Sequence, residues 1–101
     1  MIKATFKRKD NFIEEINITG HAKYNEYGKD IVCAGVSSSL ITTVNAILLF
    51  DKDAIKYNES NNFNLVNLKK DNITNTLLEN LFNSLKAIEK DYKDNIKVKE
   101  E

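Results

Sequence analysis

One histidine and one cysteine are the side chains of this sequence best suited to covalent chemistry. His21 is the only histidine of the 101 residues, and Cys33 is the only cysteine. A thiolate can attack a carbonyl carbon, and an imidazole can take up the thiol proton and return it to a leaving amine, so the pair can perform acyl transfer. Both residues also have ordinary roles, because a single cysteine is often a small buried hydrophobe and a single histidine is often a surface residue. The residue types alone leave both interpretations open.

The sequence between His21 and Cys33 indicates how the two side chains can lie close together in the fold. Residues 20–29 follow neither helical nor strand periodicity and are bracketed by glycines, so we expect a long loop, which in a small domain is often functional. Asp30 can cap a helix that continues to about Phe50, and this places Cys33 in the first helical turn. Because the loop must return the chain to that helix, His21 and Cys33 can be neighbours in space.

A cysteine in the first turn of a helix is stabilised as the thiolate. The unpaired backbone N–H groups and the positive end of the helix dipole both favour its charge, so its pKa can fall well below the free value of about 8.5. The backbone N–H groups of Ala34 and Gly35 can stabilise a developing oxyanion, and their small size leaves the path of attack open. Gly35 also costs about 1 kcal/mol relative to alanine inside a helix, which the close approach of another group would explain.

Four further residues near the pair have both a structural and a functional interpretation. Asp30 is either a simple N-cap or the group that orients the histidine. Ser37 lies one turn beyond Cys33 on the same face, where a hydroxyl ordinarily bonds a carbonyl of the preceding turn. Tyr24 and Tyr27 are either ordinary loop aromatics or parts of a lid that lies over a bound peptide.

Periodicity along the chain predicts an α+β domain. Strand-like alternation and helical spacing of the apolar residues give the order strand, strand, helix, strand, strand, helix and a short last strand, at residues 2–7, 12–18, 30–50, 54–57, 63–68, 72–92 and 96–98. Hairpins join the paired strands, so we expect a mainly antiparallel sheet packed with two α-helices.

The apolar residues of each predicted helix also predict its buried face. In the first helix, residues at helical spacing form one stripe, and Ile31, Ile41 and Leu49 widen it, which indicates burial on more than one side. In the second helix the expected stripe consists of Ile73, Leu77, Leu81, Leu85 and Ile88.

Length and composition limit the class of function. The 101 residues fit a single domain, 1–101, and the content of 42% hydrophobic and 30% charged residues is that of a globular protein. Fifteen basic residues balance fifteen acidic ones and Arg8 is the only arginine, so binding to nucleic acid is disfavoured. No unbroken apolar run approaches the roughly 20 residues of a membrane span, so we expect no membrane association.

Cysteine and histidine content bear on location and metal binding. A single cysteine fits a reducing compartment, and the charged N-terminal residues differ from a signal peptide, so we expect a cytoplasmic protein. One cysteine and one histidine cannot supply the four ligands of a structural zinc site. We therefore expect neither a metal nor a cofactor.

Two short motifs resemble the signature of a known family. They are Gly20-His21-Ala22 and Gly28-Lys29-Asp30-Ile31-Val32-Cys33-Ala34-Gly35-Val36-Ser37. Together, and at this separation, they are similar to the signature of the ribosomal-processing cysteine proteases, the Prp family. The resemblance covers essentially the whole chain through its length and the pattern of its elements. Gly35 is a departure, because alanine is more usual there in the family.

The resemblance implies a specific activity. Members of the family are cytoplasmic bacterial endopeptidases that remove a short N-terminal extension from a protein of the 50S ribosomal subunit, cutting after an aromatic-rich segment and before a small residue. By this match Cys33 is the nucleophile, His21 is the general base and acid, and Asp30 and Ser37 support the site. The family is typically homodimeric, and its histidine-bearing loop orders over the substrate. Two glycines of the motif, Gly20 and Gly28, can act as hinges of that loop.

Two other classes of function are compatible with the residues alone. The first is a non-enzymatic, ribosome-associated or regulatory dimeric interaction module, in which Cys33 only contributes to packing. The second is an RNA-binding protein, which the zero net charge opposes, although Lys69-Lys70 and the lysine-rich C-terminal segment can form a local basic patch.

Overall fold

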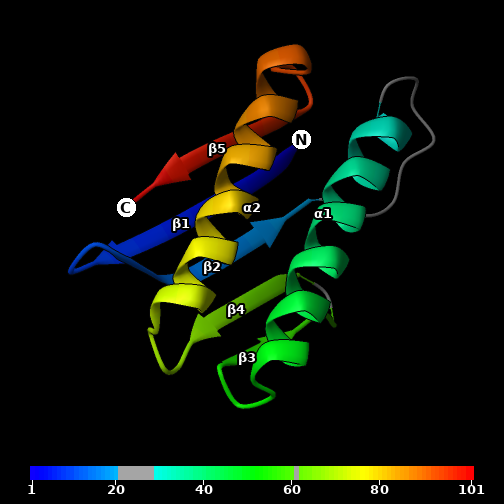
Figure 1. Cartoon of the computed structure of the whole chain (residues 1–101). Coiled ribbons are helices and arrows are strands. Elements are labelled where there is room, and N and C mark those ends of the chain that lie inside the picture. Colours follow the sequence, from blue (N-terminus) through cyan, green and yellow to red (C-terminus); the bar gives the residue numbers. More distant parts are fainter. Residues whose placement is uncertain (21–28, 61) are drawn as a thin grey trace.

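The computed structural model describes residues 1–20, 29–60 and 62–101, and the predicted order of elements is confirmed there (Figure 1). The elements are β1 (Ile2–Lys9), β2 (Phe12–Thr19), α1 (Lys29–Phe50), β3 (Ile55–Asn58), β4 (Phe63–Asn67), α2 (Asn72–Asp91) and β5 (Ile96–Glu100). The α+β class is therefore confirmed, including the short last strand.

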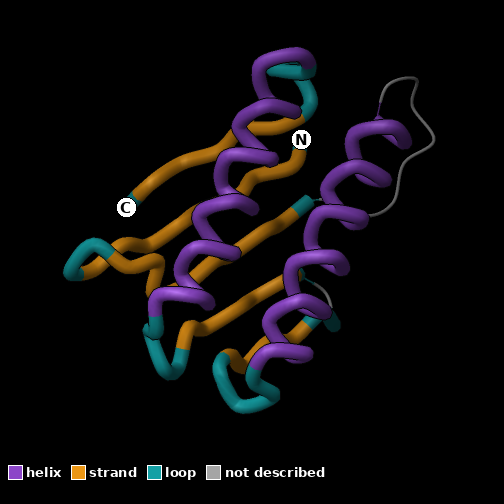
Figure 2. Tube along the Cα trace, in the orientation of Figure 1, coloured by secondary structure: helices purple, strands orange, loops and turns teal. Residues whose placement is uncertain are grey.

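The five strands form one mixed sheet in the order β3-β4-β2-β1-β5. Three of its strand pairs are antiparallel, as expected, and β5 pairs with β1 in parallel. The parallel pair follows from the path of the chain, because α2 carries it from β4 to β5 and a helical crossover is the usual connection to a parallel strand. Both helices lie on the same face of the sheet (Figures 1 and 2), so the hydrophobic core lies between that face and the helices.

A β-bulge beside the first hairpin sets which side chains of β2 face the helices. Ile13 and Ile16 are both fully buried, although a regular strand would point residues three apart to opposite faces. In the register, Ile13 pairs with Arg8 while Glu15 pairs with Lys7. The residue between Ile13 and Glu15 is therefore an additional one, and it returns the strand to its buried face.

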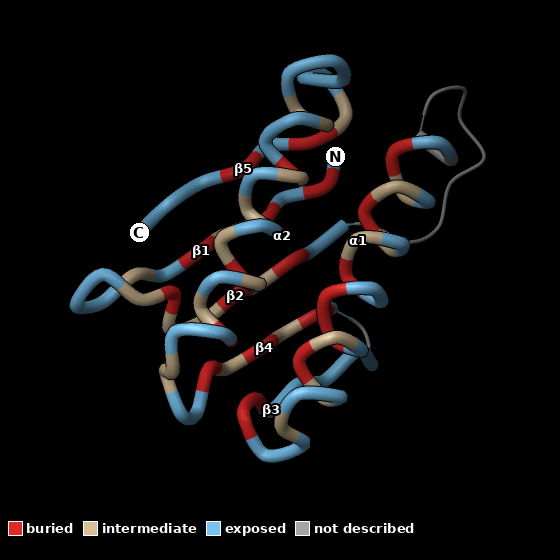
Figure 3. The backbone as a smooth tube through the Cα atoms, viewed as in Figure 1, coloured by how far each residue is buried: buried red, intermediate tan, exposed pale blue. Residues whose placement is uncertain are grey.

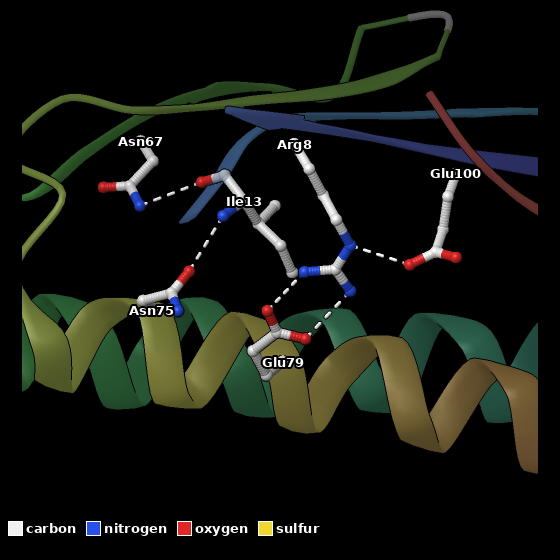
Figure 4. A network of polar contacts seen from close by, with 6 residues as sticks. All are labelled: Arg8, Ile13, Asn67, Asn75, Glu79 and Glu100. Carbon is white, nitrogen blue, oxygen red and sulfur yellow. Dashed lines mark hydrogen bonds and ion pairs between the residues drawn. The ribbon is translucent and has the colours of Figure 1, made fainter. Parts of the chain in front are cut away.

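Two asparagines bind the backbone of the bulge. The N–H of Ile13 donates to Asn75 Oδ1 at 2.8 Å, and Asn67 Nδ2 donates to the carbonyl oxygen of Ile13 at 3.0 Å (Figure 4). Ile13 and Asn67 are both buried, and an unsatisfied polar group at such a depth costs about 1–3 kcal/mol. The end of β4 and the start of α2 therefore hold the bulge in place.

Arg8 joins three elements beside the bulge. Its guanidinium donates to both carboxylate oxygens of Glu79 on α2 and, at 2.7 Å, to Glu100 on β5 (Figure 4). It also lies 5.1 Å from the centre of the Phe82 ring, within the range of a cation–π interaction. The hydrogen bond to Glu79 is the largest of the contributions that raise the pKa of Arg8 above its ordinary value. Arg8 therefore ties β1 to α2 and to β5.

The buried face of α1 is narrower than the sequence predicts (Figure 3). Five of the six residues predicted for its stripe are buried, namely Val32, Val36, Leu40, Val44 and Ile47, and the sixth, Leu48, is partly buried and packs against the core. The prediction that Ile31, Ile41 and Leu49 are also buried is wrong, because these side chains are 58%, 56% and 89% exposed. In the described structure α1 packs against the sheet and α2 along one side only, so its outer side faces solvent.

The predicted buried stripe of α2 is partly wrong. Ile73 is exposed, and the buried residues are Thr74, Leu78, Leu81 and Leu85. The local cause lies at the start of the helix, where Asp71 is the N-cap and its carboxylate accepts hydrogen bonds from both the N–H and the hydroxyl of Thr74. This capping turns Thr74 toward the core and leaves its neighbour Ile73 outside.

Taken as a whole, α1 is more apolar than its short unbroken apolar runs suggest, and this bears on the prediction of no membrane association. Residues Ile31–Phe50 form a helix long and apolar enough to cross a membrane, with a mean hydropathy of 1.8. The core helix of a folded domain can have the same length and composition. One third of the stretch is buried in this domain, where the inner stripe of α1 packs in the core.

We expect acid to destabilise the fold through the carboxylates that bind α2 to its surroundings. Asp71 accepts the N–H of Thr74 at 2.8 Å, and Glu89 accepts the N–H of Val98 at 2.8 Å. These hydrogen bonds hold the pKa of Asp71 and Glu89 below their ordinary values of 3.8 and 4.5. The unfolded chain therefore binds protons at a higher pH than the folded one, so this stability is complete above about pH 5 and is lost as the pH falls through the folded values.

Urea unfolding at pH 7 and at pH 3.5 measures this effect. Glu89→Gln should lower the free energy of unfolding at pH 7 and make its fall in acid shallower. Glu101→Gln, a change at an exposed residue, is the matched control and should leave the pH dependence unchanged. An unaltered pH dependence in Glu89→Gln would contradict the assignment.

Candidate active site

Cys33 lies near the start of α1, on the border between the core and the surface. It is the fifth residue of the helix, is half-buried, and packs against the hydrophobic core. The helix begins at Lys29, so Asp30 is its second residue and not the N-cap that the sequence predicts. The unpaired N–H groups of a helix are those of its first four residues, here 29–32. Cys33 therefore lies in the second turn, directly after these groups, and not in the first turn as expected.

Ala34 and Gly35 follow Cys33 inside the helix. At these positions the backbone N–H groups point along the helix toward the carbonyl groups four residues earlier. Their role as oxyanion donors is therefore still a prediction. A Cβ atom on Gly35 would lie 3.4 Å from Cδ1 of Ile88 on α2. This is an ordinary van der Waals distance, so the packing against α2 leaves room for alanine, and no close approach explains the glycine at position 35.

One turn beyond Cys33, Ser37 lies at the edge of a pocket. The described residues give its hydroxyl no hydrogen bond, and it is Ser39 that donates to the carbonyl of Gly35, at 2.9 Å. Ser39 therefore makes the kind of helix-internal bond that the sequence suggested for Ser37. The pocket has a volume of about 120 Å³ and is lined by Ser37, Leu40, Ile41, Glu59 and Phe63.

Gly20 ends β2 in a conformation that requires glycine. Its φ is +76°, and a Cβ atom there would overlap the carbonyl oxygen of Met1. The chain thus leaves β2 directly beside the start of β1. This close approach gives Gly20 a structural role in addition to the hinge predicted from the motif.

Several predicted site residues cannot be placed. His21, Tyr24, Tyr27 and Gly28 lie outside the described residues, and so does the side chain of Asp30. Their roles as base, lid, hinge and orienting group therefore stay predictions. Among the described residues, no group of three or more His, Cys, Asp or Glu side chains is arranged to hold a metal ion.

Comparison with known families identifies the family of this chain. The sequence model of the family described as cysteine protease Prp matches residues 1–97. The chain belongs to the Prp family. It is therefore an enzyme, a cysteine protease, and the resemblance found in the sequence motifs is confirmed.

Two relatives in the Prp family agree over most of their length. The ribosomal processing cysteine protease Prp of Bacillus subtilis (strain 168) is 33% identical over 107 aligned positions, which cover 97% of this chain and 96% of the relative. The protein of the same name from Staphylococcus aureus (strain Mu50 / ATCC 700699) is 34% identical over 90 positions, which cover 85% of each chain.

Solved structures have the same fold. The essential Prp of S. aureus in complex with a substrate peptide matches with a TM-score of 0.92 and 29% identity, over all of both chains. The same protease with a covalently linked product peptide matches with a TM-score of 0.87 and 30% identity, again over all of both chains. SMU.848 from Streptococcus mutans matches at 0.85 and 29%, over 99% of this chain and 93% of that one.

Sequence reasoning missed the pocket beside Ser37. The sequence predicts that Ile41 is buried, although it follows Cys33 and Ser37 at helical spacing, and Glu59 lies between the predicted strands 54–57 and 63–68. An apolar residue in line with a candidate nucleophile is a signal for a groove. That signal becomes specific only when the fold shows that Ile41 is exposed and that Phe63 lies beside it.

Gly35→Ala should stabilise the protein. Alanine is favoured over glycine in a helix interior by about 1 kcal/mol, and a Cβ atom 3.4 Å from Ile88 Cδ1 is an ordinary contact. Urea unfolding should therefore show an increase of about 0.5–1 kcal/mol. Gly20→Ala is the opposite case, because of its positive φ, and should destabilise. A clear loss of stability in Gly35→Ala would mean that the helices are packed more tightly than we describe.

Proposed function

We propose that the protein is a cysteine endopeptidase that removes the N-terminal extension of a 50S ribosomal-protein precursor, with Cys33 as nucleophile and His21 as general base and acid. The observation that carries the proposal is the place of Cys33, which is half-buried on a flank of α1 that continues into a pocket. The relatives are named as ribosomal processing proteases, and the S. aureus relative was solved with a substrate peptide. We also propose a location in the bacterial cytoplasm, which the single cysteine and the ribosomal processing named for the relatives support.

The proposed reaction needs only the two side chains and water. His21 takes the proton of Cys33, and the Sγ atom attacks the carbonyl carbon of the peptide bond. The tetrahedral intermediate collapses to a thioester, while the imidazolium gives its proton to the departing amine. A water molecule, deprotonated by the imidazole, then attacks the thioester and releases the carboxyl product and the thiol. The nearby N-terminus of α1 favours the thiolate through its dipole.

The other predicted residues receive supporting roles in this proposal. Ser37 has a hydroxyl that the described protein leaves for a bond to the substrate backbone. Asp30 orients His21, and the chain between Gly20 and Gly28 brings Tyr24 and Tyr27 over the bound peptide. The oxyanion is stabilised by backbone N–H groups near Cys33, those of Ala34 and Gly35 included if the helix start rearranges around the substrate.

Cleavage of a ribosomal-protein precursor tests the proposal directly. The wild-type protein should release the extension under reducing conditions and leave a precursor with a scrambled extension intact. Cys33→Ala and His21→Ala should abolish the cleavage, and Cys33→Ser should be nearly inert, because a hydroxyl is far less ionised than a thiol near pH 7. Mass spectrometry of the products locates the cut. Undiminished cleavage by Cys33→Ala would refute the role of Cys33.

The rate of alkylation by iodoacetamide measures the thiolate independently of any substrate. An activated Cys33 should react well below pH 8, because the thiolate is the reactive form. His21→Ala should move this reactivity to higher pH, with unfolding followed by circular dichroism as the control. A thiol that reacts only above pH 8 in both proteins would indicate that Cys33 is a packing residue.

We also propose that the protein is a homodimer. Two large side chains at the end of α1 support this, because Leu49 is 89% exposed and Phe50 is 48% exposed. Sedimentation should show a dimer for the wild type and a monomer for Leu49→Glu, since a carboxylate is costly to bury in an apolar interface. Thr76→Glu, at an exposed position of α2, is the matched control and should stay dimeric. A monomeric wild type would refute this part of the proposal.

A further inference from the structure

The pocket beside Ser37 joins two distant parts of the chain. Ser37, Leu40 and Ile41 come from the middle of α1, while Glu59 and Phe63 come from either side of the β3–β4 turn. Leu40 and Phe63 are almost completely buried and form an apolar floor. Ile41 and Glu59 are exposed and stand at the mouth. The pocket therefore has an apolar interior and one carboxylate at its entrance.

The position of the pocket relates it to Cys33. Cys33, Ser37 and Ile41 follow one another at intervals of four residues and so share one flank of α1. At 1.5 Å per residue, Ser37 lies about 6 Å and Ile41 about 12 Å along the helix from Cys33. An extended peptide advances about 3.3 Å per residue. A peptide attacked at Cys33 and lying along this flank would bring a side chain to the pocket two or three residues from the attacked bond.

The size of the pocket indicates what kind of group can occupy it. Sites for independent small-molecule ligands usually have about 300–1,000 Å³, so 120 Å³ is too small for such a ligand. An apolar cavity of about 150 Å³ holds a benzene molecule. A single branched aliphatic side chain or an aromatic ring therefore fits, and a peptide that is already held at Cys33 can supply it.

We propose that this pocket is a specificity site that takes one apolar side chain of the substrate, two or three residues from the cleaved bond. Ile41 sets its width, and the carboxylate of Glu59 favours a basic residue of the substrate next to the bound side chain and disfavours an acidic one. The inference rests on the proposed role of Cys33 as the nucleophile. It adds residues that neither the sequence motifs nor the position of Cys33 assigns.

Matched peptides and pocket variants test the site. Peptides that carry alanine, leucine, phenylalanine or glutamate at each of the four positions on either side of the cleaved bond are compared by kcat/KM. With wild-type protein, one position two or three residues from the bond should prefer leucine or phenylalanine. Ile41→Phe narrows the pocket and should lower kcat/KM for the large side chains at that position about tenfold, with little change for alanine. Ile41→Ala should shift the preference toward phenylalanine.

The control repeats the same substitutions at Ile73, which is exposed at the start of α2. Ile73→Phe and Ile73→Ala should leave the preference unchanged. If the Ile41 variants lowered kcat/KM equally for all peptides, or for none of them, the inference would be overturned. For the charge, Glu59→Lys should reverse the preference between lysine and glutamate beside the bound side chain, whereas Glu101→Lys should not.

A binding measurement separates this inference from the proposed function. Fluorescence anisotropy of labelled peptides on the Cys33→Ala protein requires no cleavage. If Ile41→Phe in that background weakens binding of the leucine peptide but not of the alanine peptide, the pocket is supported even where no cleavage occurs. If peptides are cleaved at Cys33 but neither binding nor cleavage depends on Ile41, the pocket is refuted while the nucleophile stands.

Discussion

The packing of α1 against the sheet is the constraint on which the candidate site depends. Val32, Val36 and Leu40 are buried against the sheet, and this fixes the rotation of the helix about its axis. Cys33 and Ser37 directly follow two of these residues, about 100° further around the helix, and therefore lie on the border of the core. A rotation in one direction would seal the thiol in the core, and a rotation in the other would turn it out into solvent. The sulfur atom of the candidate nucleophile is therefore positioned by the apolar side chains of the buried stripe.

The sheet that receives α1 is itself held by polar contacts at the bulge. The extra residue in β2 keeps both Ile13 and Ile16 buried, and the backbone N–H and carbonyl groups of Ile13 bond to side chains. Asn75 and Asn67 satisfy these two groups, and Arg8 ties the same region to α2 through Glu79. Because α2 packs against α1 at Gly35, these contacts reach the helix that carries Cys33. The fold thus couples a hairpin on one side of the domain to the orientation of the site helix.

The sequence predicts the order of the helices and strands correctly, but it predicts less well which of their side chains are buried. The reason is that element order follows from local patterns, whereas burial depends on distant segments. Periodicity is a local property, so seven elements in the right order follow from it. The motif residues around Cys33 are equally local. Whether an apolar residue such as Ile41 is buried depends on how many layers cover the helix, which no local pattern determines. The start of α1 at Lys29 and the bulge in β2 depend on contacts between segments far apart in the chain.

The pocket is a second feature that local sequence patterns do not predict. Its walls come from α1 and from the β3–β4 turn, so neither segment alone shows a recognition feature. Ile41 is apolar and exposed, and it lines the pocket together with the buried Leu40 and Phe63. Two neighbouring stripes of α1 therefore have different surroundings. The inner stripe holds the helix on the sheet, and the flank beside it carries both the half-buried Cys33 and the residues that line the pocket.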